Sequence, residues 1–150
     1  MAGTQDLDTA TAVLTAAREQ KSAEDAAALK QFELAADWAA MHSTDTLAGE
    51  WEGELSLAGE GAPEVAEFCI AEFALAIGKS TDAGRRYLGE AIEVRYRLPR
   101  IWKLVTTGKL AVWKACRIAQ ATVLLPMEGA AYVDRHVAPT AARISFAQLD

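Results

Sequence analysis

The residues best suited to catalysis in this sequence are two histidines, His42 and His136, and two cysteines, Cys69 and Cys116. Activating a nucleophile or a metal needs several such groups at defined spacings, and the chain has no HExxH, GxSxG, Walker-loop or CxxC pattern. His42 is expected at a helix end, where a cation favours the helix dipole. The cysteines are expected to be reduced thiols. The sequence therefore assigns no catalytic residue, no metal site and no cofactor.

Three glutamates alternate along the segment EWEGELSL, namely Glu50, Glu52 and Glu54. The alternation permits a short strand or hairpin arm with these carboxylates on one face, which is the ligand type a hard cation prefers. A solvated acidic loop between Ser43 and Pro63 explains the same residues more simply. We therefore make no metal assignment from them.

Lysine and arginine are concentrated in the middle of the chain, although its 150 residues carry a net charge of −6. Up to Pro63 there are three cations and twelve acids, a net charge of −9, whereas residues 79–117 hold ten cations and three acids, a net charge of +7. Screening at physiological salt acts over about 8 Å, so a local basic patch can hold phosphates even on an acidic protein. The candidate nucleic-acid contacts are Lys79, Arg85, Arg86, Arg95, Arg100, Lys103, Lys114 and Arg117.

Two interpretations of these cations stay open. In the first, Lys79, Arg85 and Arg86 face a DNA duplex and the other five hold phosphates. In the second, the charges satisfy one another on a solvated helix face, because acids and arginines are spaced four residues apart and each such pair contributes about 0.2–0.5 kcal/mol. The pairs concerned are Asp82 with Arg86, Arg86 with Glu90, and Glu93 with Arg97.

The segment ALAIGKSTDAGRRYL, residues 74–88, has the spacing of a helix-turn-helix unit. Ala74 lies four residues before Gly78, and Ser80 follows as a helix cap. Gly84 departs from the pattern, because a β-branched residue is usual there; either the two helices approach closely at Gly84 or the unit is imperfect. A plain corner between two packed helices has the same caps.

Helical periodicity covers most of the chain, which predicts an all-α multi-helix bundle. The first forty residues are expected to form a long amphipathic helix, either continuous or divided at the possible capping box that begins with Ser22. Further helices are expected from Glu64 to Gly78, from Ser80 to Leu98, from Pro99 to Gly108, from Val112 to Pro126 and from Glu128 to Ala138. Trp102 and Trp113 suit a core at this spacing better than base stacking.

The predicted organisation is an N-terminal helical arm over residues 1–45, an acidic glycine-rich loop over 46–63 and a helical core over 64–150 that carries the helix-turn-helix-like unit. Ser145 and Gln148 form a second capping box, which announces a helix that the chain does not supply. We therefore expect a truncation at the C-terminal end. No targeting segment or apolar run long enough to cross a bilayer is visible, so we expect a soluble, cytoplasmic protein without a membrane partner.

Four ordered segments carry a resemblance to a known family: ELAADWAAMHS, STDAGRRYLGEAIEVRYRLPRIW, VWKACRIAQAT and AAYVDRHVAP. From about Ala16 to Asp150 the chain resembles domain-of-unknown-function family 222, the 13E12 repeat family. The resemblance implies an α-helical region that forms the N-terminal part of proteins ending in an HNH endonuclease domain. The catalytic histidines of that domain have no counterpart here. Lys114 and Cys116 stand where the family usually has arginine, which weakens any phosphate-binding face.

Two functional hypotheses follow. In the first, the chain is a non-catalytic helical module of an HNH-endonuclease-type protein that binds or positions DNA. In the second, it is a scaffold that forms a homodimer, or packs against a nuclease domain, through its long N-terminal helix.

Overall fold

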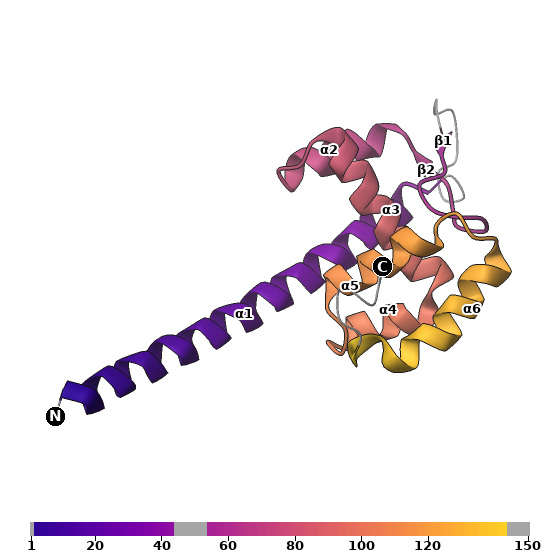
Figure 1. The fold of residues 1–150 in the computed structure, drawn as a ribbon. Helices are drawn as coiled ribbons and strands as arrows, with labels where there is room; N and C mark the ends of the chain where they lie inside the picture. The colour runs from indigo at the N-terminus through magenta and orange to yellow at the C-terminus, as the bar shows by residue number, and fades with distance from the viewer. Residues whose placement is uncertain (1, 44–53, 144–150) are drawn as a thin grey trace.

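A computed structural model of the chain describes residues 2–43 and 54–143, and it confirms an all-α bundle. The described helices and strands are α1 (Ala2–Met41), β1 (Glu54–Leu55), β2 (Val65–Ala66), α2 (Phe68–Ala76), α3 (Thr81–Arg97), α4 (Pro99–Thr106), α5 (Val112–Thr122), α6 (Met127–Val137) and a final 3-10 helix, η1 (Ala138–Arg143). Figure 1 shows a body made of these short helices and one long helix, α1, that extends away from it. None of the described helices is both long and apolar enough to cross a membrane.

Helix α1 is continuous, so the division considered at Ser22 does not occur. Lys21 spans this region with ion pairs to Glu24 at 3.2 Å and to Asp25 at 2.8 Å. Capping needs extended backbone at the serine, and the surrounding alanines favour helix instead. The apolar stripe of α1 is buried only in its last third, through Phe32, Ala35, Ala36 and Ala39.

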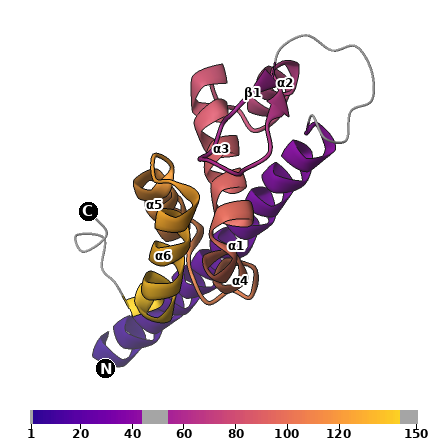
Figure 2. The ribbon, with the colours of Figure 1, turned by 90° about the vertical axis from the view of Figure 1, so that its right-hand side faces the viewer.

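Helix α3 is the centre of the bundle. It packs against α1, α2, α4, α5 and α6; Figure 2 shows α2 on one side of it, α5 and α6 on the other, and α1 running diagonally across the view. Leu88, Ile92 and Val94 are fully buried along its length, together with Phe32 from α1 and Ile101 from α4. Elements on both sides of α3 thus share one core.

The predicted helix boundaries around α3 are confirmed where local capping signals set them. Gly78 and Gly108 have φ of 70° and 74°, the left-handed conformation that glycine adopts without strain at a helix C-terminus. The Ser80 hydroxyl accepts a hydrogen bond from the Ala83 amide at 3.1 Å, and Pro99 opens α4.

The helix expected from Glu64 begins later, at Phe68, because Val65 and Ala66 pair with β1 as an antiparallel strand. The Ala66 amide also donates to the His42 carbonyl at 2.9 Å, which ties this strand to the end of α1. Of the possible hairpin in EWEGELSL, Glu54 and Leu55 form β1; Glu50 and Glu52 lie outside the described residues, as does the capping box at Ser145.

The expected solvated pair of Glu93 and Arg97 is buried instead. Their side chains are 1% and 0% exposed, and Arg97 Nε lies 3.5 Å from Glu93 Oε2. Arg97 Nη2 donates to the carbonyls of Thr122 at 3.3 Å and Leu125 at 2.6 Å. Glu93 accepts from the Gly59 amide at 2.9 Å and from the Thr122 hydroxyl at 2.7 Å. This ion pair joins α3 to the loop before β2 and to the end of α5, so its role is in the core.

Candidate nucleic-acid interface

The corner between α2 and α3 is closely packed at the glycine that departs from the helix-turn-helix pattern. A Cβ atom added to Gly84 would lie 2.3 Å from the Ala74 Cβ, nearer than any real contact. The absence of a side chain at Gly84 therefore lets α2 and α3 approach, which decides between the two explanations considered for this residue. Ser80 fixes the start of α3 by its cap.

The first two turns of α3 hold most of its exposed side chains, although Tyr96 near the other end of the helix is also 38% exposed. Thr81, Asp82, Arg85 and Arg86 are exposed. Beyond them Gly89 lies under the Leu57 carbonyl, because an added Cβ would be 2.5 Å from that oxygen. A groove of DNA could therefore meet the N-terminal end of α3, whereas the stretch around Gly89 is covered. Recognition helices make base contacts from this same end.

Lys79 lies just before this corner and is exposed. Its ammonium is 5.7 Å from the centre of the Tyr87 ring, a cation–π distance. Burial raises the pKa of the Tyr87 phenol to about 12, with a smaller opposing contribution from a hydrogen bond with Gln31. Lys79, Arg85 and Arg86 thus all belong to the N-terminal end of α3 or the turn before it, and the lysine lies against an aromatic ring.

Arg95 is placed differently from its prediction. It is one of the five candidates for phosphate contacts, yet its guanidinium forms an ion pair with Asp37 of α1 at 3.1 Å. The same group lies 5.6 Å from the Tyr96 ring centre and 5.8 Å from that of Trp102. These contacts hold Arg95 against α1, so it is the candidate least able to reach a phosphate.

Arg100 and Lys103 project from α4, beyond the C-terminal end of α3. A helix of 17 residues is roughly 25 Å long, so these two cations are far from Arg85 and Arg86. The buried carboxylate of Asp134 on α6 caps α4 by accepting the Arg100 and Ile101 amides at 3.1 and 3.0 Å. Leu98, the residue before α4, has no side-chain acceptor for this purpose.

Lys114 and Arg117 lie on α5. Lys114 Nζ is 5.7 Å from the ring centre of Trp113, which is 43% exposed, whereas Trp102 packs against Phe32 in the core at 5.9 Å between ring centres. Core packing is thus confirmed for Trp102 but not for Trp113. The eight candidate cations divide into the α2–α3 corner, α4, α5 and the paired Arg95.

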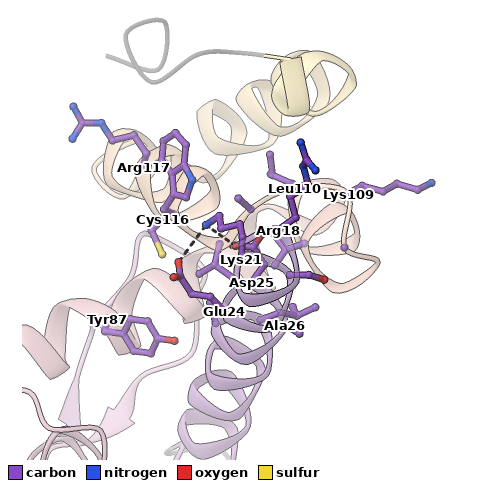
Figure 3. A pocket seen from close by; sticks show the side chains of 18 of the residues that line it. Arg18, Lys21, Glu24, Asp25, Ala26, Tyr87, Lys109, Leu110, Cys116 and Arg117 are labelled. Carbon is purple, nitrogen blue, oxygen red and sulfur yellow. Dashed lines mark hydrogen bonds and ion pairs between the residues drawn. The ribbon is translucent and has the colours of Figure 1, made fainter. Parts of the chain in front are cut away.

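A groove of about 1020 Å³ separates α1 from α5 and the turn before α5. Figure 3 shows Lys21 in it, bonded to Glu24 and Asp25, with Arg117 and Lys109 on opposite sides. Cys116 also lines this groove, and burial, followed by the nearby Glu90 carboxylate, raises the pKa of its thiol. The thiol is therefore protonated and weakly nucleophilic at neutral pH.

The two histidines have ordinary structural contacts. His42 Nδ1 lies 2.8 Å from the Trp38 carbonyl oxygen, and its ring packs on Trp38 with centres 4.1 Å apart. His136 packs on Tyr132 at the same distance. Among the described residues no group of three or more histidine, cysteine, aspartate or glutamate side chains is arranged to hold a metal ion.

Sequence reasoning missed the buried roles of Glu93, Arg97 and Asp134. One signal was present, because Gly89, Glu93 and Arg97 are spaced by four residues and so share one face of α3. A glycine inside a helix indicates close approach of another segment, which implies that this face is covered.

In comparisons with known proteins, this chain matches no protein-family model, no curated protein and no solved structure.

Proposed function

We propose that this chain is a non-catalytic helical module that binds or positions DNA through the N-terminal end of α3, as part of a protein of the HNH-endonuclease type. The link to that protein type is carried by the four resembling segments. The DNA contact is carried by the geometry of the α2–α3 corner, where Arg85 and Arg86 are exposed on a helix start that Ser80 holds in place.

The observation that carries this proposal is that Arg85 and Arg86 are exposed and make no ion pair within the described residues. No ion pair is found for Arg85 or Arg86 among the described residues, whereas Arg95 and Arg97 each have a carboxylate partner. The ion pair expected between Asp82 and Arg86 is also not found, although the structure describes both residues. Exposed guanidinium groups at the start of a helix can reach base edges or phosphates without first breaking an internal contact.

The remaining cations support a smaller role for phosphate contacts. Lys79 extends the corner cluster, and Lys114 and Arg117 lie on α5, which packs against α3. Arg100 and Lys103 lie on α4, beyond the far end of α3, and are too distant to serve the same few phosphates. The acidic α1 lowers long-range attraction, so association should be slow and sensitive to salt.

The test is a titration of labelled duplex DNA at several salt concentrations. Each phosphate contact contributes about −0.9 to the slope of log affinity against log salt, and each lost base contact weakens binding by about 1–3 kcal/mol. The variant Arg85→Ala with Arg86→Ala should therefore bind markedly more weakly. Arg135→Ala with Arg143→Ala is the matched control, because it removes the same charge from exposed positions on α6 and η1.

Absence of binding at low salt would refute the proposal. An equal loss in both double variants would also refute it, because such a loss would reflect overall charge and not the α2–α3 corner.

A further inference from the structure

The N-terminal two thirds of α1 forms a rod that buries none of its described side chains. Every residue from 8 to 28 is exposed, including the apolar Val13 at 61% and Leu14 at 55%. From Ala2 to Ala28 the helix is about 40 Å long, and Figure 1 shows it leaving the body as a single straight extension. Helices in proteins gain most of their stability from packing one face, and this segment packs none.

The groove lies where the rod leaves the body. The wall that the body contributes is mostly apolar, through Tyr87, Val105, Leu110 and Val112. Among the described residues of that wall the charged ones are Lys109 and Arg117. The acids that line it, Glu24 and Asp25, both belong to α1 and are paired with Lys21. The described body wall is thus apolar with a cationic edge (Figure 3).

We propose that this groove receives the α1 rod of a second copy of the chain. The rod has the complementary chemistry, because residues 8–28 carry four acids and two cations, a net charge of −2, around exposed Val13 and Leu14. A helix suits the groove because one wall is already a helix. If the two rods lie antiparallel and each enters the groove of the other copy, the dimer has a twofold axis and both copies make the same rod-in-groove contact.

Other occupants fit the same residues less well. A nucleic acid would bring phosphates against Glu24 and Asp25, and a basic helix would face Lys109 and Arg117. The inference does not require the proposed DNA contact, because Arg85 and Arg86 do not line the groove; Arg117 is a candidate in both.

Sedimentation equilibrium of the full chain tests this inference. The wild-type chain should be a dimer that weakens as salt is raised, since charged edges contribute to it. Leu14→Glu should raise the Kd of the dimer about tenfold or more, because it places a charge in an apolar contact. Leu124→Glu is the matched control: Leu124 is 94% exposed outside the groove, so its substitution should leave the Kd unchanged. Circular dichroism confirms that each variant keeps its helices.

A second pair of variants tests the groove itself. Lys109→Glu should weaken the dimer because it reverses a charge on the groove, whereas Lys103→Glu, an exposed lysine of α4 that does not line it, should not. A wild-type chain that remains monomeric at high concentration overturns the inference. So does equal weakening by Leu14→Glu and Leu124→Glu, and a dimer indifferent to Lys109→Glu overturns the assignment of the groove.

Discussion

At the scale of single residues, the buried ion pair of Glu93 and Arg97 holds three parts of the fold together. The Arg97 guanidinium fills the space beside Gly59, where an added Cβ would lie 1.3 Å from Nη1. Its partners are carbonyls at the end of α5 and the carboxylate of Glu93, which in turn holds the Gly59 amide and the Thr122 hydroxyl. A charge in such surroundings is stabilised only while its partner is present.

We expect Arg97→Ala to lower the free energy of unfolding by about 3–5 kcal/mol, because it leaves the Glu93 carboxylate buried without its counter-charge. Urea denaturation measures this change. Arg85→Ala, an exposed arginine of the same helix, should change stability by no more than about 0.5 kcal/mol. Replacing both partners, as in Glu93→Leu with Arg97→Met, should recover much of the loss, and a double variant as unstable as the single one would contradict this account.

Tyr87 gives the stability of the fold one pH dependence. Its pKa of about 12 in the folded protein is above the ordinary value of 10, chiefly because of burial. Between pH 10 and 12 the unfolded chain has released this proton while the folded chain keeps it, so stability from this group is complete below pH 10 and is lost as the pH rises through this range.

Ultraviolet titration of the phenols measures this directly. One of the three tyrosines should ionise late, near pH 12, and the late phase should be missing in Tyr87→Phe. Ionisation of Tyr87 near its ordinary pKa of 10 would show that this phenol is not buried as described.

At the scale of elements, the contact between α2 and α3 depends on one missing side chain. Alanine for glycine inside an exposed helix stabilises by roughly 1 kcal/mol. At Gly84 the same change should destabilise, because the new Cβ would meet that of Ala74 at 2.3 Å.

The exchange of both residues provides the control. In the double variant Ala74→Gly with Gly84→Ala, removal of the Ala74 methyl group makes room for the new methyl group at position 84. The double variant should therefore be more stable than Gly84→Ala alone in thermal and urea unfolding. Additive effects of the two substitutions would contradict a direct contact between the two positions.

The boundaries of these elements could be predicted because the signals for them are local. Gly78, Ser80, Pro99 and Gly108 act within one turn of the chain, and each begins or ends a helix as expected. The covered face of α3 could not be predicted in the same way. Glu93 and Arg97 have the spacing of an exposed pair, and the partners that bury them come from segments 25 to 34 residues away. The exposure of Arg85 and Arg86 could likewise be predicted, whereas the ion pair of Arg95 could not, because its partner Asp37 lies 58 residues away.

At the scale of the whole molecule, the rod contributes little to the free energy of unfolding of the body. Residues 8–28 bury no side chain, whereas Phe32, Ala35 and Ala36 are completely buried. Removing residues 1–17 should therefore leave the unfolding midpoint of the body nearly unchanged at low protein concentration, where association contributes little.

Removing residues 1–33 should be far more damaging, because it takes Phe32 from contact with Tyr87 and Trp102. Loss of a buried phenylalanine alone costs about 3–5 kcal/mol. Urea denaturation of the two shortened chains measures the difference. Equal stability of both would contradict the assignment of Phe32 to the core of the body.

The carboxylate that caps α4 has a consequence for the order of events during synthesis. Asp134 lies 34 residues after Arg100 in the chain. A ribosome adding about 5–20 residues per second supplies that aspartate roughly 2–7 s after the amides it must hold. The amides of Arg100 and Ile101 in the first turn of α4 are therefore synthesised before the carboxylate that accepts their hydrogen bonds. These bonds form only after α6 has been made, so the packing of α6 on α4 is a late step in the folding of the new chain.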